Sequence, residues 1–548
     1  MPDPLPRVPS SCGRGGWLRR CPKRRTRWGT RQRPAVALAL LALALAASPP
    51  AASARVSGAA SGVAVRVGAQ PDSRPIPAGF LGLSIEYSSA LYYFGSDPSA
   101  INPLFITLLR QLTPGQAPVI RFGGDTTDWT WWPTPGVARP PGIRYALGPE
   151  WVDIVHAAAQ ALGARLILGI NLEADNAAIA RTESDELLAG LGPQSIAGFE
   201  LGNEPEVYGT LGWYATPKGI EVPGRAASYD FGSYLSDFHR ISATLPASVP
   251  LVGPASGASQ WISGLARYLK RNPRVRIVTY HRYPLDRCYT ARGSPNYPTL
   301  SNLLAPASSA GLADSLIPAL RVAHARGLAL RADELNSVSC GGKLGVSDTF
   351  ASSLWVLDTL FNMAAVGVDG VNIHTFRNAW YEPFAFSEAD GHWTAQVKPL
   401  YYGLLMFAQA APAGARLLPA SVPAGAPFDA WATRAPDGTV RVVLINDAVH
   451  RWVTAAVRPP SAVRPPSAAP PPSAAPPPGT AETAIAQSLR APRLGASGGV
   501  TFGGQTFGAT TTTGTLAGQP ASQSLAAVDG RFVVRLPPAS ATLITVGG

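Results

Sequence analysis

Two acidic segments contain the residues best suited to catalysis. The stretch "FELGNEPEVYG", residues 199–209, holds Glu200, Glu204 and Glu206, and "ADELNS", residues 332–337, holds Asp333 and Glu334. A pair of facing carboxyl groups is what glycoside hydrolysis requires: one is protonated and assists the leaving oxygen, while the other is ionised and attacks the sugar or activates water. The surrounding elements decide which two carboxyl groups face each other.

Short apolar runs recur between longer helix-compatible stretches from about residue 79 to residue 375. There are eight of them: "GFLGLSIE", "PVIRF", "RLILGIN", "IAGFELG", "VPLVGP", "VRIVTYH", "LALRADE" and "GVNIHT". Eight strands that alternate with helices over about 300 residues predict an α/β fold, a (β/α)8 TIM barrel. We expect this barrel to occupy residues 79–400.

Polar residues close or follow most of these runs. The candidates are Glu86, Asp125, Asp128, Asn203, Glu204, His281, Tyr283, Glu334, His374, Asn378 and Tyr381. Residues at the carboxyl ends of barrel strands form the active-site mouth, so this set predicts a ring of polar groups around one opening. Glu204 and Glu334 follow the fourth and seventh runs, which lie across the barrel, and they are the expected catalytic pair.

The neighbouring acids have simpler interpretations. Glu200 lies two residues before the end of the fourth run, and Asp333 directly precedes Glu334, so its side chain points to the opposite face of the strand. We expect each to take a structural hydrogen bond. Glu206 lies beyond Pro205 on a loop, and we expect it to be solvated; the alternative is a contact with a distant sugar subsite. The alternative for Glu204 and Glu334 is an ion pair with Arg or Lys at the rim, and motif context is needed to decide.

The motifs, taken in order, resemble glycoside hydrolase family 79, the β-glucuronidase and heparanase family. They are "GLSIEY", "RFGGDTTD", "FELGNEP", "ELNSVSCGG" and "VTFGGQTFG". The resemblance implies a retaining glycosidase with Glu204 as general acid/base and Glu334 as nucleophile. It further implies that Asn203 contacts the sugar 2-hydroxyl, that Tyr283 orients Glu334, and that Glu86 and Asp128 bind sugar hydroxyls.

One motif departs from the pattern of that family. Heparanase-like members carry a Tyr five residues after the nucleophile, where this chain has Ser339 and then Cys340, Gly341 and Gly342. The backbone N–H groups at Gly341 remain suited to a substrate carboxylate, and Tyr381 is the expected source of the aromatic hydroxyl. The barrel loops also lack dense basic patches, which favours an exo-acting enzyme over one that cleaves inside a sulfated polymer.

Beyond Tyr401 the sequence changes to segments with the pattern of β-strands. "FDAWATRAPDGTVRVVLIND" contains a hairpin signal at "PDG", and "GRFVVRLPPASATLITV" alternates as a strand does. We expect an accessory C-terminal β-sandwich over residues 401–548, with an N-terminal strand in 55–78 joining it. The Pro/Ala/Ser repeat at 458–479 cannot bury a core and predicts a disordered insert.

The N-terminal segment has the pattern of a secretory signal peptide. Residues 1–34 carry ten Lys and Arg against one Asp, and "AVALALLALALAA" then leads to Ala52-Ser53-Ala54. A signal peptide over residues 1–54, cleaved near Ala54, predicts a secreted or periplasmic protein, and the apolar run is shorter than a membrane anchor requires. Only +3 of the net charge of +12 then remains, which argues against a nucleic-acid partner.

Cysteine usage agrees with export. After cleavage Cys288 and Cys340 remain as an even pair, and we expect a disulfide rather than two free buried thiols. No zinc-protease or phosphate-loop motif is present, so we expect no cofactor and no metal.

The expected function is therefore a secreted, retaining, exo-acting β-glucuronidase that releases terminal glucuronic acid or 4-O-methylglucuronic acid from a glycan or glycoside. Two alternatives stay open: the same mechanism on another sugar, as in a β-xylosidase or an α-L-arabinofuranosidase, and a non-catalytic carbohydrate-binding protein.

Overall fold

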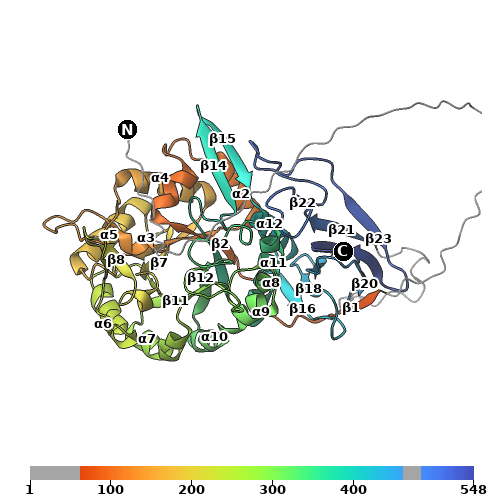
Figure 1. The fold of residues 1–548 in the computed structure, drawn as a ribbon, viewed down its shortest axis with the longest axis horizontal. Coiled ribbons are helices and arrows are strands. Elements are labelled where there is room, and N and C mark those ends of the chain that lie inside the picture. The colour runs from red at the N-terminus through yellow and green to blue at the C-terminus, as the bar shows by residue number, and fades with distance from the viewer. Residues whose placement is uncertain (1–61, 461–482, 548) are drawn as a thin grey trace, which may run out of the picture. The chain divides into compact units, whose positions relative to one another are not determined.

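The computed structural model describes residues 62–460 and 483–547. The predicted signal peptide and almost all of the predicted Pro/Ala/Ser insert lie outside these residues. Within them the chain forms a barrel followed by a β-sandwich, as Figure 1 shows. This confirms the predicted fold class.

Eight parallel strands close the barrel in chain order. They are β2 (Leu81–Glu86), β3 (Val119–Gly123), β6 (Arg165–Ile170), β7 (Ile196–Leu201), β10 (Leu251–Ser256), β11 (Val275–Arg282), β12 (Ala329–Leu335) and β13 (Gly370–Thr375). Each coincides with one of the eight apolar runs. The runs are nearly continuous in apolar residues because parallel strands are covered on both faces.

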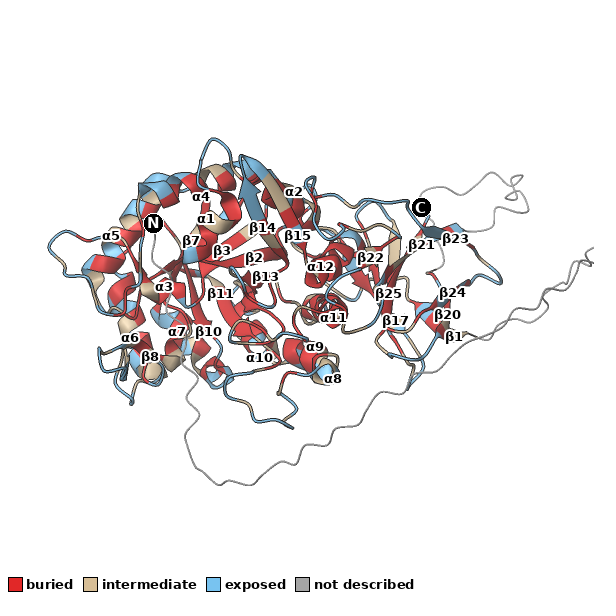
Figure 2. Ribbon diagram, turned by 45° about the horizontal axis from the view of Figure 1, so that its top comes forward, coloured by how far each residue is buried: buried red, intermediate tan, exposed pale blue. Residues whose placement is uncertain are grey.

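Helices between the strands form the outer layer of the barrel. The principal ones are α2 (Pro103–Leu112), α4 (Pro149–Leu162), α5 (Ala177–Leu191), α6 (Phe231–Ser242), α7 (Leu265–Arg271), α9 (Pro306–Asp314), α10 (Ile317–His324), α11 (Phe350–Val366) and α12 (Pro399–Ala410). Shorter helices are α1 (Ala90–Phe94), α3 (Thr126–Trp129) and α8 (Leu300–Leu303). Their inward faces are buried, as Figure 2 shows in red.

By length and composition alone, the helical stretch Leu300–His324 is apolar enough to cross a membrane. In the fold it is broken into α8, α9 and α10. Helix α9 packs on α11, and α10 packs on β12. This stretch is therefore part of the helix layer of the barrel.

The sandwich consists of two sheets. The larger one contains β16 (Arg416–Leu418), β18 (Asp429–Arg434), β19 (Val440–Asn446), β25 (Ser540–Val546), β21 (Thr483–Arg490), β22 (Thr501–Phe502) and β23 (Ser522–Ala526). The smaller one contains β17 (Ala420–Ser421), β1 (Val63–Val67), β20 (Val453–Arg458) and β24 (Phe532–Leu536). Strand β1 pairs in parallel with β20, so the start of the described chain is held in the sandwich.

Strand β19 shows how the larger sheet is buried on both faces. Val442 and Leu444 belong to the core between the two sheets, whereas Val443 and Ile445 belong to the core shared with the barrel helices. Successive side chains of a strand point to opposite faces, so one alternating strand serves two cores. Rings of Phe361 on α11 and Trp431 on β18 stack across this junction at 5.5 Å.

Candidate active site

Glu204 and Glu334 lie at the carboxyl ends of β7 and β12. Glu204 follows Gly202 and Asn203, which come directly after β7, and its φ of 45° is in the left-handed region, which is uncommon for a residue with a Cβ. Its backbone N–H donates to the carbonyl of Ala255 at 2.9 Å, which holds this turn. The Glu204 side chain is 30% exposed and that of Glu334 is 8% exposed, so both border one opening.

The two carboxyl groups face each other at short range. One carboxyl oxygen of Glu204, one of Glu334 and one ring nitrogen of His281 all lie within 4.8 Å of one another. Retaining glycosidases hold their carboxyl groups about 5–5.5 Å apart, whereas inverting enzymes need about 6.5–9.5 Å to admit a water. The short separation matches direct attack by one carboxylate.

The same three residues offer enough ligand atoms for a metal ion. However, Glu334 Oε2 already accepts from Arg121 at 2.7 Å, and His281 Nε2 lies 3.3 Å from the same guanidinium. A divalent cation would be placed against a fixed positive charge. The arrangement therefore fits acid–base chemistry better than metal binding.

Arg121, on β3, is the central residue of the site, and it is absent from the residues predicted from the sequence. Its side chain is completely buried. Nη1 donates to Glu334 at 2.7 Å, Nε donates to Glu200 at 2.6 Å, and Nη2 donates to the amide oxygen of Asn203 at 2.9 Å. The signal was present in "PVIRF", where an arginine interrupts an otherwise apolar strand and must have buried anions around it.

The two glycines of "RFGGD" make room for charged groups. A Cβ at Gly123 would overlap the Arg121 guanidinium, and a Cβ at Gly124 would overlap the Glu86 carboxylate. Gly124 also has a φ of 71°, which glycine adopts without strain. This motif is therefore explained by the side chains that pack against it.

The surroundings of Glu334 keep it ionised. Burial by itself raises the pKa of this carboxyl, but His374, His281 and Arg121 together lower the pKa well below its usual range. Tyr283 donates its hydroxyl to Glu334 Oε1 at 2.9 Å, the contact that the prediction for Tyr283 required. Both oxygens of Glu334 are thus oriented by protein donors, which suits a nucleophile.

His281 connects the two carboxyl groups. Its Nδ1 lies 3.0 Å from Glu204 Oε1 and 3.8 Å from Glu334 Oε2. Burial tends to lower the pKa of His281, but Glu334 and the hydrogen bond to Glu204 help to raise it to about 9. The ring can therefore supply a proton on the Glu204 side of the pair.

Asn203 and Asp128 occupy different layers of the site. Asn203 binds Arg121 through its oxygen, and no described residue accepts from its amide nitrogen, so this nitrogen is available to a ligand. Asp128 was predicted to bind sugar hydroxyls, but its oxygens accept from the N–H groups of Leu172, Glu173 and Asn203 and from the Tyr208 hydroxyl. The structure corrects that prediction, because Asp128 lies behind the site and positions Asn203.

Glu86 is also engaged by the protein. Its carboxylate accepts from the N–H groups of Asp125 and Thr126 and from the Thr126 hydroxyl, at the start of α3. His374 Nε2 lies 3.5 Å from it. Glu86 thus borders the site. Its carboxylate mainly anchors the loop after β3, so it is not left free for sugar hydroxyls as predicted.

The corner predicted for a substrate carboxylate contains Gly341 and Tyr381. Gly341 has a φ of 79°, and no described group accepts from its N–H. Tyr381 is buried, and its ring centroid lies 6.3 Å from that of Tyr283 and 6.0 Å from that of His374. The structure thus places Tyr381 beside two residues that contact or approach Glu334.

The remaining acids differ in outcome. Glu200 is buried and accepts from Arg121 and from the Thr279 hydroxyl, which confirms its structural role. Asp333 lies 3.2 Å from Arg121 Nε, and burial and the negative charge of Glu200 raise the pKa of Asp333 well above its ordinary value. The prediction of a solvated Glu206 is wrong, because the loop folds back and Gly257 N–H donates to its Oε1 at 2.5 Å.

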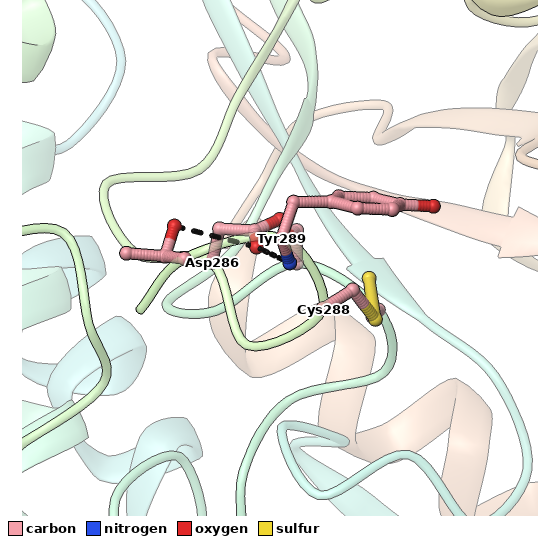
Figure 3. The surroundings of a disulfide bond; sticks show 6 residues. Asp286, Cys288 and Tyr289 are labelled. Carbon is pink, nitrogen blue, oxygen red and sulfur yellow. Dashed lines mark hydrogen bonds between the residues drawn. A yellow bond between two sulfur atoms is a disulfide. The ribbon is translucent and has the colours of Figure 1, made fainter. Parts of the chain in front are cut away.

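A disulfide joins the loops that follow β11 and β12, as predicted for Cys288 and Cys340. Figure 3 shows Asp286 beside it, accepting from the N–H of Tyr289 at 2.6 Å; Ser339 donates to the same Asp286 carboxylate at 2.5 Å. The bridge spans 52 positions of sequence and fixes the wall next to Glu334.

Comparisons with known proteins agree with this geometry, although no family model matches the chain. A β-glucuronidase of Neurospora crassa is 22% identical over 386 residues, which cover 62% of this chain and 65% of the relative. A β-glucuronidase of Aspergillus niger is 24% identical over 459 residues, 75% of this chain and 80% of the relative. The alignment thus spans just under two thirds of the Neurospora protein.

Solved structures share the fold. A 4-O-α-L-rhamnosyl-β-D-glucuronidase from Fusarium oxysporum has a TM-score of 0.65 at 20% identity, covering 88% of this chain and 100% of that one. A GH51 arabinofuranosidase from Xanthomonas axonopodis has a TM-score of 0.61 at 15% identity, covering 89% and 100%. Fold, carboxyl pair and curated relatives support one class of enzyme, the glycoside hydrolases.

Replacing Gly123 tests the role of Arg121 without removing its charge. In Gly123→Ala the new methyl group displaces the guanidinium, and we expect hydrolysis to fall by at least about tenfold and the free energy of unfolding by about 1–3 kcal/mol. Gly498→Ala, where the added Cβ meets open space, is the matched control. Equal activity of the two variants would contradict the packing argument.

Tyr283→Phe tests the orientation of the Glu334 carboxylate. It removes only the hydroxyl that donates to Glu334, and hydrogen bonds to charged groups contribute about 1.5–3 kcal/mol, so kcat/KM should fall about 10- to 100-fold. The free energy of unfolding should fall by no more than the same amount. Tyr289→Phe, at a side chain that is 72% exposed, should behave as wild type, and wild-type activity of Tyr283→Phe would refute the assigned contact.

Glu206 should make stability depend on pH. Burial, followed by the negative charge of Glu204, raises the pKa of Glu206 to about 7, whereas a Glu in the unfolded chain titrates near ~4.3. Its contribution to stability is therefore complete below about pH 4.3 and is lost as pH rises through 7.

Glu206→Gln removes this titration and should raise the free energy of unfolding at pH 8 by about 1–3 kcal/mol, with little change near pH 4. Urea denaturation at both pH values measures the effect. Glu186→Gln, at an exposed position, serves as the control. Parallel pH profiles of Glu206→Gln and wild type would show that Glu206 does not carry the dependence.

Proposed function

We propose that the protein is a secreted, retaining, exo-acting β-glucuronidase of the glycoside hydrolase family 79 type, which releases terminal glucuronic acid or its 4-O-methyl form. The observation that carries the proposal is the pair Glu204 and Glu334, with carboxyl oxygens within 4.8 Å and the latter fixed by Arg121 and Tyr283. The two curated β-glucuronidases support the choice of sugar.

The mechanism follows from this geometry. Glu204 gives its proton to the glycosidic oxygen while Glu334 Oε1 or Oε2 attacks the anomeric carbon, so the C–O bond to the aglycone breaks as the ester bond to Glu334 forms. Glu204, now ionised, takes a proton from a water that attacks the same carbon. The ester bond breaks, and the sugar leaves with retained configuration.

Asn203 is placed to bind the sugar next to the acid. Its amide nitrogen is available, and its oxygen is fixed by Arg121. For the uronate carboxylate we propose the corner made by the Gly341 N–H and the Tyr381 hydroxyl. The Tyr381 ring lies beside the rings of Tyr283 and His374, and the Gly341 carbonyl accepts from the N–H of Trp380, the residue before Tyr381. A rigid donor pair at this corner favours a terminal acidic sugar.

Secretion is part of the proposal. The Cys288–Cys340 disulfide supports it, because such bridges persist in oxidising compartments.

The second candidate is an α-L-arabinofuranosidase, which the fold shared with the Xanthomonas arabinofuranosidase favours. Both candidates use the same carboxyl pair. They differ in what occupies the corner at Gly341, where an arabinofuranoside has no carboxylate to bind. Substrate choice therefore separates them.

Hydrolysis of chromogenic glycosides tests the proposal. We expect release from 4-nitrophenyl β-D-glucuronide, with the β-anomer of the sugar appearing first by NMR, and far slower release from the β-D-xyloside and the α-L-arabinofuranoside. Preferential cleavage of either neutral glycoside would overturn the uronate assignment. The α-anomer as first product would overturn retention.

Glu334→Gln should lower kcat by at least about 10³-fold, since it removes the nucleophile. Glu204→Ala should lose less activity on 4-nitrophenyl β-D-glucuronide, because 4-nitrophenolate leaves without a proton. Added azide should restore activity, since it can attack the glycosyl-enzyme without a general base. Glu388→Gln, at an exposed position on the hairpin strand β14 (Phe384–Ala389), is the matched control. Near-normal activity of Glu334→Gln would sink the assignment of the nucleophile.

A further inference from the structure

A second hollow lies on the sandwich, outside the catalytic opening. Its volume is about 530 Å³. It is lined by the loop after β19, the segment after β21, the turn before β25 and the first residue of α8: Val449, His450, Trp452, Arg490, Ala491, Pro492, Arg493, Leu494, Gly495, Pro537, Pro538, Ala539 and Leu300. We refer to this set as the sandwich hollow.

The sandwich hollow exposes apolar surface that the fold does not use. Val449 and Trp452 are each 48% exposed, and Pro492 is exposed beside them. The guanidinium of Arg535 lies 4.3 Å from the centre of the Trp452 ring and holds the indole in place. An indole fixed in this way is suited to stack on the apolar face of a pyranose ring.

The ionisable residues of the sandwich hollow are two arginines and one histidine. Arg490, Arg493 and His450 line it and are exposed, and its lining contains no Asp or Glu. Across residues 62–460 and 483–547, neither arginine forms an ion pair. Asp447, the nearest acid along the loop, lies instead near Asp358 and Asp429, and it does not line the hollow. Unpaired guanidinium groups in a concave surface attract carboxylates, which they can bind through two hydrogen bonds.

The sandwich hollow is close to the catalytic opening. Asn296 lines the hollow of about 360 Å³ that contains Glu204, and Leu300 lines the sandwich hollow. Four residues of chain span at most about 14 Å, so the two hollows are neighbours. Lys343 adds a cation between them, since its ammonium donates to the carbonyl of Pro298 at 2.7 Å.

We propose that the sandwich hollow binds an acidic polysaccharide, stacking a pyranose ring on Trp452 and pairing uronate carboxylates with Arg490 and Arg493. The choice of a uronate-bearing polymer rests on the proposed β-glucuronidase function, whereas the binding itself requires no catalysis. A polymer held there presents its terminal sugars beside Glu204. The sandwich thus contributes to substrate capture, and the barrel performs the hydrolysis.

Direct binding to polygalacturonate, measured with the full chain by affinity gel electrophoresis, tests the proposal. Trp452→Ala and the double variant Arg490→Gln/Arg493→Gln should each weaken binding by about tenfold or more. Arg321→Gln/Arg326→Gln removes the same charge from exposed positions on and just beyond α10 and should bind as wild type. All variants should keep wild-type kcat/KM on 4-nitrophenyl β-D-glucuronide.

Several results would contradict one of the two proposals. No binding of wild type to polygalacturonate, or equal binding by the sandwich-hollow variants and the control, overturns the proposal. Equally tight binding of single-stranded DNA that Trp452→Ala leaves unchanged overturns it in favour of a general polyanion surface. Failure to hydrolyse the aryl glucuronide overturns the proposed function but leaves the binding result standing, so the two failures are distinguishable.

Discussion

The buried guanidinium of Arg121 is the charge around which the catalytic opening is built. A charge taken fully out of water costs several kcal/mol, and removal of one partner of a buried ion pair costs about 3–5 kcal/mol. Here Glu200 and Glu334 compensate the charge directly. Burial lowers the pKa of Arg121, but these carboxylates raise it well above its ordinary value, so it stays cationic. The ionised state of Glu334 follows in part from this interaction, because Arg121 lowers the pKa of Glu334 together with His374 and His281.

The same cluster explains how charge is handled during the proposed reaction. When Glu334 forms an ester it loses its negative charge, and at that moment Glu204 gains one by giving up its proton. His281 lies between the two, 3.0 Å from Glu204 and 3.8 Å from Glu334, so a positive ring faces a carboxylate in both states. The net charge of the cluster is unchanged by the first step. Because the net charge of this buried cluster stays the same, the step creates no additional charge that water would have to solvate.

The sequence was sufficient for the barrel and for the carboxyl pair, and the reasons are physical. Eight short apolar runs that alternate with helix-compatible stretches are typical of a parallel barrel, and the acids at the carboxyl ends of its strands share one opening. Arg121 was missed because a charged residue in mid-strand was treated as part of the run, although its burial demanded anions. Asp128 and Glu206 were misplaced because backbone N–H groups of folded loops donate to their carboxyl groups, as the N–H of Gly257 does to Glu206 Oε1. A sequence shows which residues end a strand, but not which backbone groups return to meet them.

The larger sheet of the sandwich connects the proposed binding and catalytic functions. Each of its central strands buries one face against the smaller sheet and the other against α11 and α12 of the barrel. At the junction Trp431 donates its indole N–H to Asp358 on α11 at 2.8 Å, and its ring stacks on Phe361 of the same helix. Interfaces of this kind, apolar and closed by a buried hydrogen bond, do not permit free hinge motion. A polymer bound on the sandwich is therefore held at a defined distance from Glu204, and this rigidity, rather than affinity alone, would make capture useful for an enzyme that removes terminal sugars one at a time.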